Sequence, residues 1–296
     1  MMWGGFSNYS RNILTLTVGT LLAISTATAR AGDGPLNVSL GDRNSSVGFC
    51  LTDCENTGST EGGNGGITPG HNSWLVDDVS QLTQEWFWYR TSSTSPEFPV
   101  SNLNYAGHML ADTNPFSDDR NDTLSVMYTG GGFEMELSFQ LRGGNAGSMT
   151  SDLAEQIRIK NTGTVPLNFS IFQYVDFDLD GTAAGDTAEV INPNTVRQNG
   201  ELSSVSETVV SPDPTAHEVA LFNSTLTKLL NGMPDNLNNA NGPVMGDVTW
   251  AFQWDFILQP NQSFTIQKDK NIAKVPEPAS LALAAIGLAA LRRRMA

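Results

Sequence analysis

The sequence has few of the residue types on which most catalytic and metal centres depend. Its 296 residues include two cysteines and three histidines. The histidines, His71, His108 and His217, are far apart in the chain, and no two have the spacing of paired metal ligands. No Gly-x-Ser-x-Gly segment is present to carry a nucleophilic serine. We therefore expect a protein that is not an enzyme, although a carbohydrate hydrolase or lyase, for which two carboxylates can suffice, stays open.

Basic residues are also scarce. The chain has 16 Lys and Arg against 31 Asp and Glu, a net charge of −15. Five of the basic residues, Arg11, Arg30 and Arg292 to Arg294, belong to the terminal segments, and without them the balance is 11 − 31 = −20. A nucleic-acid or anionic lipid surface repels such a charge, so we expect no nucleic-acid partner. The same charge attracts divalent cations.

Helical periodicity is nearly absent, and alternation with a period of two predominates. Residues 124–129 and 133–142 alternate apolar and polar side chains on either side of a glycine turn, as in a hairpin with one buried face. Residues 156–160, 167–179 and 250–258 continue the pattern, and only 225–230 indicates a short helix. These features predict an all-β, antiparallel β-sandwich of one domain over residues 32–272. A split into two domains near residues 185–200 is the alternative.

The first 31 residues have the pattern of a cleaved export signal. Arg11 precedes an apolar stretch, residues 13–24, which is followed by small residues at Ala27 and Ala29. This small-x-small arrangement is typical of a signal-peptidase site, and Ala29 with Ala31 forms a second candidate. We therefore predict a signal helix over residues 1–31, with signal peptidase as a processing partner, and exclude this segment from the fold.

The C-terminal segment, predicted over residues 273–296, combines three features in a fixed order. A proline motif comes first, then 13 residues without a charge at 279–291, then an arginine cluster. The apolar run is shorter than the roughly 20 residues that cross a bilayer unaided. The arginines are expected on the cytoplasmic side. Candidate sorting residues are Val275, Pro276, Glu277, Pro278, Arg292, Arg293 and Arg294.

This tail resembles the PEP-CTERM sorting signal of bacterial exosortase substrates. The resemblance implies an exported protein of a Gram-negative-type bacterium whose transmembrane helix is removed by an exosortase near the proline motif. Contact with the membrane would then be transient, and the product would lie at the cell surface or in an extracellular exopolysaccharide matrix. The body of the chain also resembles exosortase substrates without an assigned function, which adds no activity.

A run of carboxylates is the sharpest candidate for chemistry in the body. Asp176, Asp178 and Asp180 alternate before Gly181 and resemble the first half of an Asp-x-Asp-x-Asp-Gly calcium loop. The twelfth position of that loop is Thr187 instead of glutamate, so Asp186 is a candidate replacement ligand. The sequence leaves open a calcium site, a solvated acidic strand end and a catalytic carboxylate set.

The two cysteines, Cys50 and Cys54, are four positions apart. Export permits a disulfide, so we predict a local bridge between them. No histidine follows Cys54 and no second cysteine pair exists, which argues against haem attachment or structural zinc.

Aromatic residues cluster at 86–89 and recur at Trp74, Trp250 and Trp254. Residues 86–89 are apolar on both strand faces, as in a central strand, and Trp250 and Trp254 alternate with polar residues. A buried core is the leading interpretation, and an exposed platform for sugar rings is the alternative. Taken together, the sequence predicts an exported structural or adhesive protein, with exopolysaccharide as its candidate partner.

Overall fold

The computed structural model describes residues 36–52 and 70–275, and in these ranges the chain is mostly β-strand. Every strand pairing within its two sheets is antiparallel. This confirms the all-β, antiparallel expectation. The predicted signal helix lies outside the described residues, as does residue 276 onward of the predicted sorting segment. No helix in the described part of the chain is long and apolar enough to cross a membrane.

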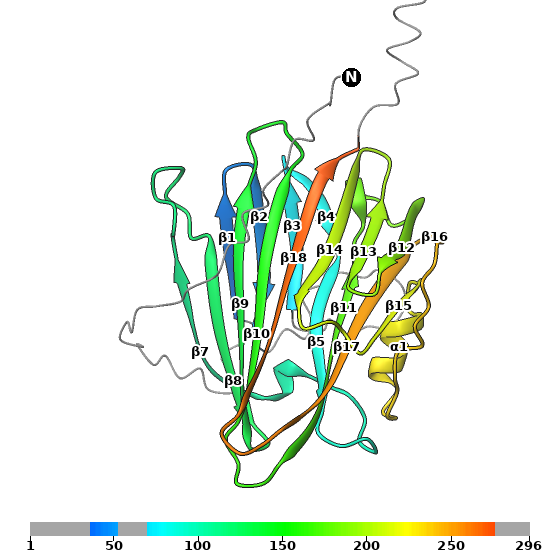
Figure 1. Ribbon diagram of the computed structural model, residues 1–296. Coiled ribbons are helices and arrows are strands. Elements are labelled where there is room, and N and C mark those ends of the chain that lie inside the picture. The colour runs from blue at the N-terminus through cyan, green and yellow to red at the C-terminus, as the bar shows by residue number, and fades with distance from the viewer. Residues whose placement is uncertain (1–35, 53–69, 276–296) are drawn as a thin grey trace, which may run out of the picture.

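The sheets lie one behind the other in Figure 1. Sheet A has the order β1 (Asn37–Asp42), β2 (Ser45–Cys50), β3 (Gly70–Val76), β5 (Gln84–Arg90), β11 (Leu167–Asp176), β17 (Val248–Leu258) and β15 (Ala216–Leu221). Two short strands join it, β4 (Val79–Leu82) on β3 and β6 (Phe98–Pro99) on β5. Sheet B has the order β16 (Val244–Gly246), β12 (Asp186–Asn192), β13 (Thr195–Asn199), β14 (Ser203–Ser211), β18 (Ser263–Lys274), β10 (Ser151–Asn161), β9 (Phe133–Gly143), β8 (Thr123–Gly130) and β7 (Asn104–Ala111).

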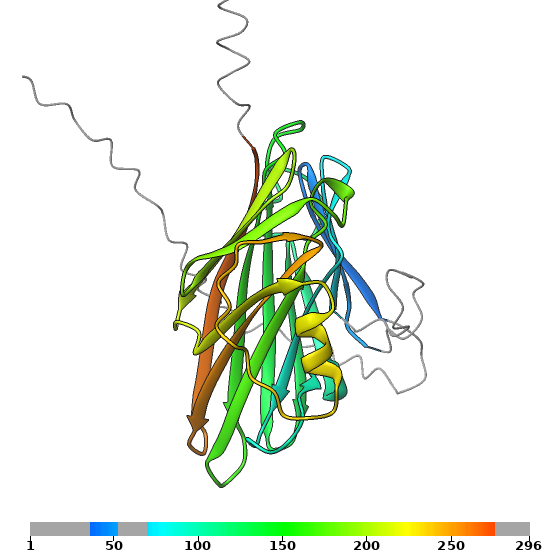
Figure 2. The same ribbon diagram turned by 90° about the vertical axis from the view of Figure 1, so that its right-hand side faces the viewer.

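The strands predicted from alternation are present, and their bounds are generally longer than expected. β8 and β9 form the predicted hairpin around Gly131 and Gly132, which have φ of 59° and 82°. These left-handed values explain the glycines, since other residues adopt them at a cost. The predicted short helix is α1 (Ser224–Leu230), which lies beside β15 (Figures 1 and 2).

β11 is shorter than predicted, because it ends at Asp176 instead of residue 179. The chain then turns through the 3-10 segment Leu179–Gly181, in which Asp180 has a left-handed φ of 61°. The carboxylate of Asp180 accepts hydrogen bonds from the amides of Leu202 and Ser203, at 2.7 and 3.2 Å. This bonding holds the turn, so Asp176, Asp178 and Asp180 do not share one face of a strand.

The apolar faces of the two sheets form one contiguous core. Trp74, Trp86, Trp88, Trp250 and Trp254 are all less than 2 % exposed. The core interpretation of these tryptophans is therefore confirmed. The indole of Trp74 donates across the core to the hydroxyl of Ser151 at 2.9 Å, which links β3 in sheet A to β10 in sheet B.

Charged side chains also lie between the sheets, and we call them the interior network. Sheet A contributes Glu85, and sheet B contributes Glu155, Glu207, Lys268 and Lys270, all with side chains no more than 1 % exposed. The ammonium of Lys268 is 2.9 Å from Glu85 and 3.0 Å from Glu207, and Lys270 pairs with Glu85 and Glu155. Each buried charge thus has an opposite partner, which buried ions require.

The outer face of sheet A, turned away from sheet B, is partly covered by α1 and the segment after it. The ammonium of Lys228 in α1 is 2.5 Å from Glu218 on β15, and the amide of Leu237 donates to Gln253 on β17 at 2.9 Å. Residues 231–239 contain no helix or strand. Outside the area covered by α1 and the segment after it, polar side chains such as Ser170 on β11 and Asp255 on β17 remain accessible.

Candidate functional site

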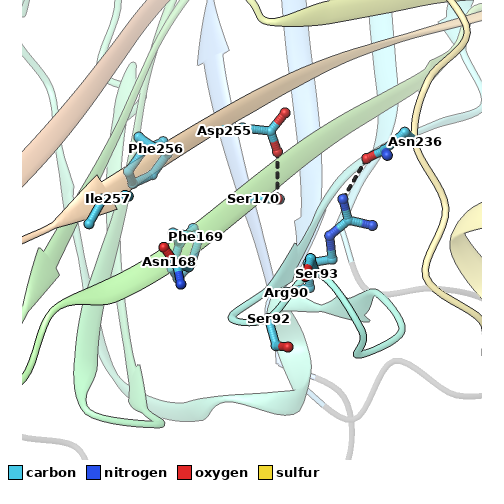
Figure 3. Close-up of a pocket in the computed structure, with 10 residues that line it drawn as sticks. All are labelled: Arg90, Ser92, Ser93, Asn168, Phe169, Ser170, Asn236, Asp255, Phe256 and Ile257. Atoms are coloured by element: carbon cyan, nitrogen blue, oxygen red, sulfur yellow. Dashed lines mark hydrogen bonds between the residues drawn. The ribbon is translucent and has the colours of Figure 1, made fainter.

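A pocket opens on the outer face of sheet A, and we call it the sheet A pocket. Its volume is about 530 Å³. Its walls come from β5, β11 and β17 and from the connecting segments after β5 and after α1 (Figure 3). The lining residues are Arg90, Ser92, Ser93, Asn168, Phe169, Ser170, Asn236, Asp255, Phe256 and Ile257. Seven of these ten side chains can form hydrogen bonds, so the pocket suits a polar ligand.

Strand register brings these residues together from distant parts of the chain. Ser170 on β11 is paired with Arg90 on β5 and with Asp255 on β17. Residues that are directly paired in neighbouring strands point to the same face of a sheet. Arg90, Ser170 and Asp255 therefore form a row across three adjacent strands.

Arg90 is the most firmly held residue of the pocket. Its guanidinium donates to the carboxylate of Glu97 and to the carbonyl of Asp235, both at 2.6 Å, and to Asn236 at 2.5 Å. The guanidinium carbon also lies 5.3 Å from the centre of the Phe172 ring, within the range of a cation–π contact. Its Nε is buried and has no hydrogen-bond partner among the described residues. Three of the five N–H donors of the Arg90 guanidinium are thus engaged, and they hold the side chain in place.

Asp255 is exposed and carries the negative charge of the pocket. Its carboxylate accepts hydrogen bonds from the hydroxyl of Ser170 at 2.5 Å and from the amide nitrogen of Gln253 at 2.9 Å. Gln253 also donates to Asn236 at 2.9 Å. These contacts fix the carboxylate in one orientation before any ligand arrives, which lowers the entropic cost of binding.

The pocket also has an apolar edge. Ile257 is 61 % exposed next to the half-buried Phe256. The Asp255 carboxylate can accept hydrogen bonds from the hydroxyls on the edge of a sugar, and the apolar surface of Ile257 can contact the C–H groups on the face of the ring. Asp255 is the only carboxylate among the ten lining residues.

The predicted calcium ligands separate into three environments. Asp176 and Asp178 lie together, and Asp247 joins them: one carboxylate oxygen from each lies within 4.8 Å of the others. Burial, and then the charges of Asp178 and Asp247, raise the pKa of Asp176 to about 8. This group is called the acidic cluster below.

Asp180 and Asp186, the other two predicted ligands, are engaged elsewhere. Asp180 accepts hydrogen bonds from Ser203 and Leu202, and Asp186 accepts one from the side chain of Gln198 at 2.5 Å. The Asp180 bonds tie the turn after β11 to the start of β14 in sheet B, and the amide of Leu179 in the same turn donates to Asp186 on β12 at 3.3 Å. The structure therefore places these two carboxylates in structural hydrogen bonding and brings Asp247 to the position beside Asp176.

The remaining predicted residues lie mostly outside the described chain. Cys50 is buried at the end of β2, whereas Cys54 is not described, so their disulfide stays a prediction. Val275 donates its amide to the carbonyl of Leu202 at 2.8 Å, directly after β18. The other sorting and cleavage candidates, Pro276, Glu277, Pro278, Arg292, Arg293, Arg294, Ala27, Ala29 and Ala31, lie outside the described residues.

Reasoning from sequence missed the sheet A pocket and Asp247. The pocket residues occur in five separate segments, and none of these segments has a motif of its own. Asp247 lies 69 residues after Asp178, directly before a strand that the sequence does predict. Asp247 immediately precedes β17, which pairs with β11. Knowledge of this strand pairing would have predicted that Asp247 lies beside Asp176.

Comparison with protein families identifies one segment. Residues 274–294 match the PEP-CTERM protein-sorting motif. The chain therefore carries this motif next to a β-rich body, and the motif implies exosortase-dependent export to the cell envelope or surface. A comparison with curated proteins by sequence gave no match.

Comparison with solved structures finds the fold in part of a larger protein. A bacterial glucoamylase complexed with acarbose matches 90 % of this chain with a TM-score of 0.50 and 9 % sequence identity. The chain spans 37 % of the length of that enzyme. A protein from Synechocystis sp. PCC 6803 matches 86 % of this chain and all of its own, with a TM-score of 0.49 and 11 % identity. At these identities the likeness concerns the fold alone.

Proposed function

We propose that this protein is an exported, exosortase-processed adhesive protein that binds exopolysaccharide through the sheet A pocket and performs no catalysis. Signal peptidase would remove residues 1–31, and the exosortase would cleave near the proline motif at residues 275–278. The body, residues 32–272, would then act as one domain at the surface or in the extracellular matrix of a Gram-negative-type bacterium. The PEP-CTERM motif supports the export part of this proposal.

The observation that carries the binding part is the prepared geometry of the pocket. Asp255 is oriented by Ser170 and Gln253, and Arg90 beside it is held in place by Glu97, Asp235 and Asn236. Charged and planar groups that are fixed in advance form stronger hydrogen bonds with ligand hydroxyls than mobile ones. Ile257 offers an exposed apolar contact beside them.

A carbohydrate-active enzyme on the same fold is the second candidate, and the match with the glucoamylase structure favours it. Glycosidases generally use two carboxylates, about 5 to 9.5 Å apart, as acid and as base or nucleophile. The pocket lining offers Asp255 alone, and two hydrogen bonds already engage it. One anchored carboxylate suits recognition better than hydrolysis, so binding is our preferred function.

The test is binding of the purified full chain to exopolysaccharide prepared from the producing bacterium. We expect saturable binding that Asp255→Ala weakens at least about tenfold, since it removes an oriented acceptor from the contact. Asp213→Ala, at an exposed carboxylate that does not line the pocket, is the matched control and should bind like the original chain.

Three outcomes would contradict parts of the proposal. Equal binding by Asp255→Ala and the original chain would remove the pocket from the interaction. Absence of saturable binding by every form would end the glycan proposal. Release of reducing sugar by the original chain, lost in Asp255→Ala, would instead establish the enzyme.

A further inference from the structure

The acidic cluster joins the end of one central strand to the start of its neighbour. Asp176 is the last residue of β11, Asp178 follows it by two positions, and Asp247 immediately precedes β17. The pairing of Asp176 with Thr249 places these two strand ends side by side. Carboxylates from two chain segments are thus held together by sheet register and not by one flexible loop.

Tyr174 gives an independent indication that the acidic cluster holds a ligand. Its side chain is fully buried, and its hydroxyl makes no close hydrogen bond to a described residue, so that only a weak interaction with the Thr249 side chain engages it. Tyr174 and Asp176 are two positions apart on β11, so they point to the same face. Their partners on β17, Ala251 and Thr249, are likewise two positions apart, so the Tyr174 ring lies on the same side of sheet A as the Asp176 carboxylate.

Asp176 itself is 2 % exposed, and its Oδ1 likewise has no hydrogen-bond partner in the described chain. A buried carboxylate oxygen and a buried hydroxyl that lack strong hydrogen bonds each carry a desolvation cost. In native proteins, such buried polar atoms are generally bound by a water molecule, an ion or another bound group. Next to three carboxylates, a cation satisfies both oxygens and also relieves the repulsion between the charges.

The donor atoms select the kind of cation. Only oxygen is offered, which suits hard cations and not zinc, whose protein ligands are mainly nitrogen and sulfur. The oxygens lie within 4.8 Å of one another, close enough for one ion to contact all three, and calcium binds oxygen at about 2.3 to 2.6 Å with six to eight ligands. Asp178 and Asp247 are half-buried, so water can complete the coordination.

We propose that Asp176, Asp178 and Asp247 form a calcium site, with the Tyr174 hydroxyl facing it, which fastens the end of β11 to the start of β17. The site is separate from the sheet A pocket, because Ser170 and Asp176 are six residues apart on β11, about 20 Å along the strand. Glycan binding and calcium binding can therefore each fail without the other.

The first measurement is thermal unfolding of the purified full chain in calcium chloride and in EGTA. At a calcium concentration a hundredfold above Kd, we expect the Tm to rise by about 5 °C or more relative to EGTA. Asp247→Asn should lose this rise, because it removes one charged ligand while keeping the shape of the side chain. Magnesium at the same concentration should give a clearly smaller rise, since it needs a tighter octahedral shell.

Asp180→Asn is the matched control. It alters a carboxylate of the same turn that is engaged with Leu202 and Ser203 instead of the acidic cluster. We expect it to lower the Tm equally in calcium and in EGTA and to keep the full calcium-dependent rise. A calcium response that survives Asp247→Asn but disappears in Asp180→Asn would overturn the proposed ligand set.

A spectroscopic measurement addresses the ligand sphere without depending on stability. Terbium, which replaces calcium at oxygen sites, emits when a nearby excited aromatic ring transfers energy to it. Tyr174 lies against the cluster, and Trp88 packs edge-on at 6.2 Å from the Tyr174 ring. We expect sensitised emission that calcium displaces and that Asp247→Asn abolishes. No emission and no calcium-dependent Tm shift, or an equal response to magnesium, would overturn the calcium assignment.

Discussion

The interior network and the acidic cluster each gather three carboxylates, but they balance the charge in different ways. Glu85, Glu155 and Glu207 meet two lysines between the sheets. In the acidic cluster, the influences on Asp176 are burial and the charges of Asp178 and Asp247, and all three raise its pKa. Where the chain supplies cations, buried carboxylates can stay ionised. Where the chain supplies no cation, a proton or a bound cation must neutralise the buried carboxylates.

The difference is visible within the interior network as well. Burial opposes the ionisation of Glu85, yet Lys268 and Lys270 hold its pKa well below the usual range. Burial, and then the charge of Glu85, raise the pKa of Glu155 to about 7. Burial lowers the pKa of His71, which faces Glu85 at 3.0 Å. Three carboxylates and two lysines leave one surplus negative charge, and a proton on Glu155 removes it.

The largest expected effect comes from removing a lysine, which makes the interior network resemble the acidic cluster. Lys270→Met takes one positive charge from between Glu85 and Glu155 while keeping an apolar stem of similar length. Breaking a buried ion pair by removing one partner costs about 3 to 5 kcal/mol. We expect a fall of this size in the free energy of unfolding, measured by urea denaturation at pH 7.

Lys274→Met is the control, because Lys274 is exposed at the end of the same strand. It should change the free energy of unfolding by no more than about 0.5 kcal/mol. Similar losses in the two variants would show that the buried lysines contribute no more than surface charges. In that case the contrast between the two regions would fail.

A smaller effect, an increase in the free energy of unfolding, is expected when the surplus carboxylate of Glu155 is removed. The pKa of Glu155 is about 7 in the folded protein against a usual value of 4.5, so the folded state holds this proton more tightly. The resulting stability is fully present below pH 4.5 and is lost as the pH rises through 7. At 1.36 kcal/mol for each unit of pKa, the loss is about 3 kcal/mol at most. Glu155→Gln removes this loss.

We therefore expect Glu155→Gln to be more stable than the original chain at pH 8 and close to it at pH 4.5, as measured by urea unfolding at both values. Glu85→Gln is the counterpart, and it should be destabilising at pH 8 because it leaves Lys268 and Lys270 with fewer partners. If both glutamines had the same effect at pH 8, the two carboxylates would be equivalent, contrary to their opposite pKa directions.

These two regions also show where sequence reasoning ends. The all-β class and the strands β8, β9 and β17 follow from alternation, because their buried faces are purely apolar. β18 is harder to recognise from the sequence, since Lys268 and Lys270 occupy its inward positions and resemble a solvated face. Their partners come from β5, β10 and β14, and only the assembled sheets bring these strands together. Asp247 was missed for the same reason: its neighbours are close in space but distant in sequence.

The smallest expected effect concerns the other face of the same two strands. Asp152 on β10 and Asp269 on β18 point outward from sheet B, while the neighbouring Glu155 and Lys270 point inward. Burial, and then the charge of Asp269, raise the pKa of Asp152 to about 7. The pH dependence has the same direction as for Glu155. The contribution of Asp152 to the free energy of unfolding is present at pH 4 and declines as the pH rises through 7.

Solvent screens this outer pair, so we expect Asp152→Asn to raise the free energy of unfolding at pH 8 by about 1 kcal/mol or less, and to have little effect at pH 4. The gain should shrink further in 1 M salt, whereas that of Glu155→Gln should not, because water and ions do not reach the interior network. Urea unfolding of both variants at low and high salt makes the comparison. Equal salt sensitivity would mean that the interior carboxylates are hydrated like those outside, and the distinction between a compensated interior and a solvated surface would not hold for these strands.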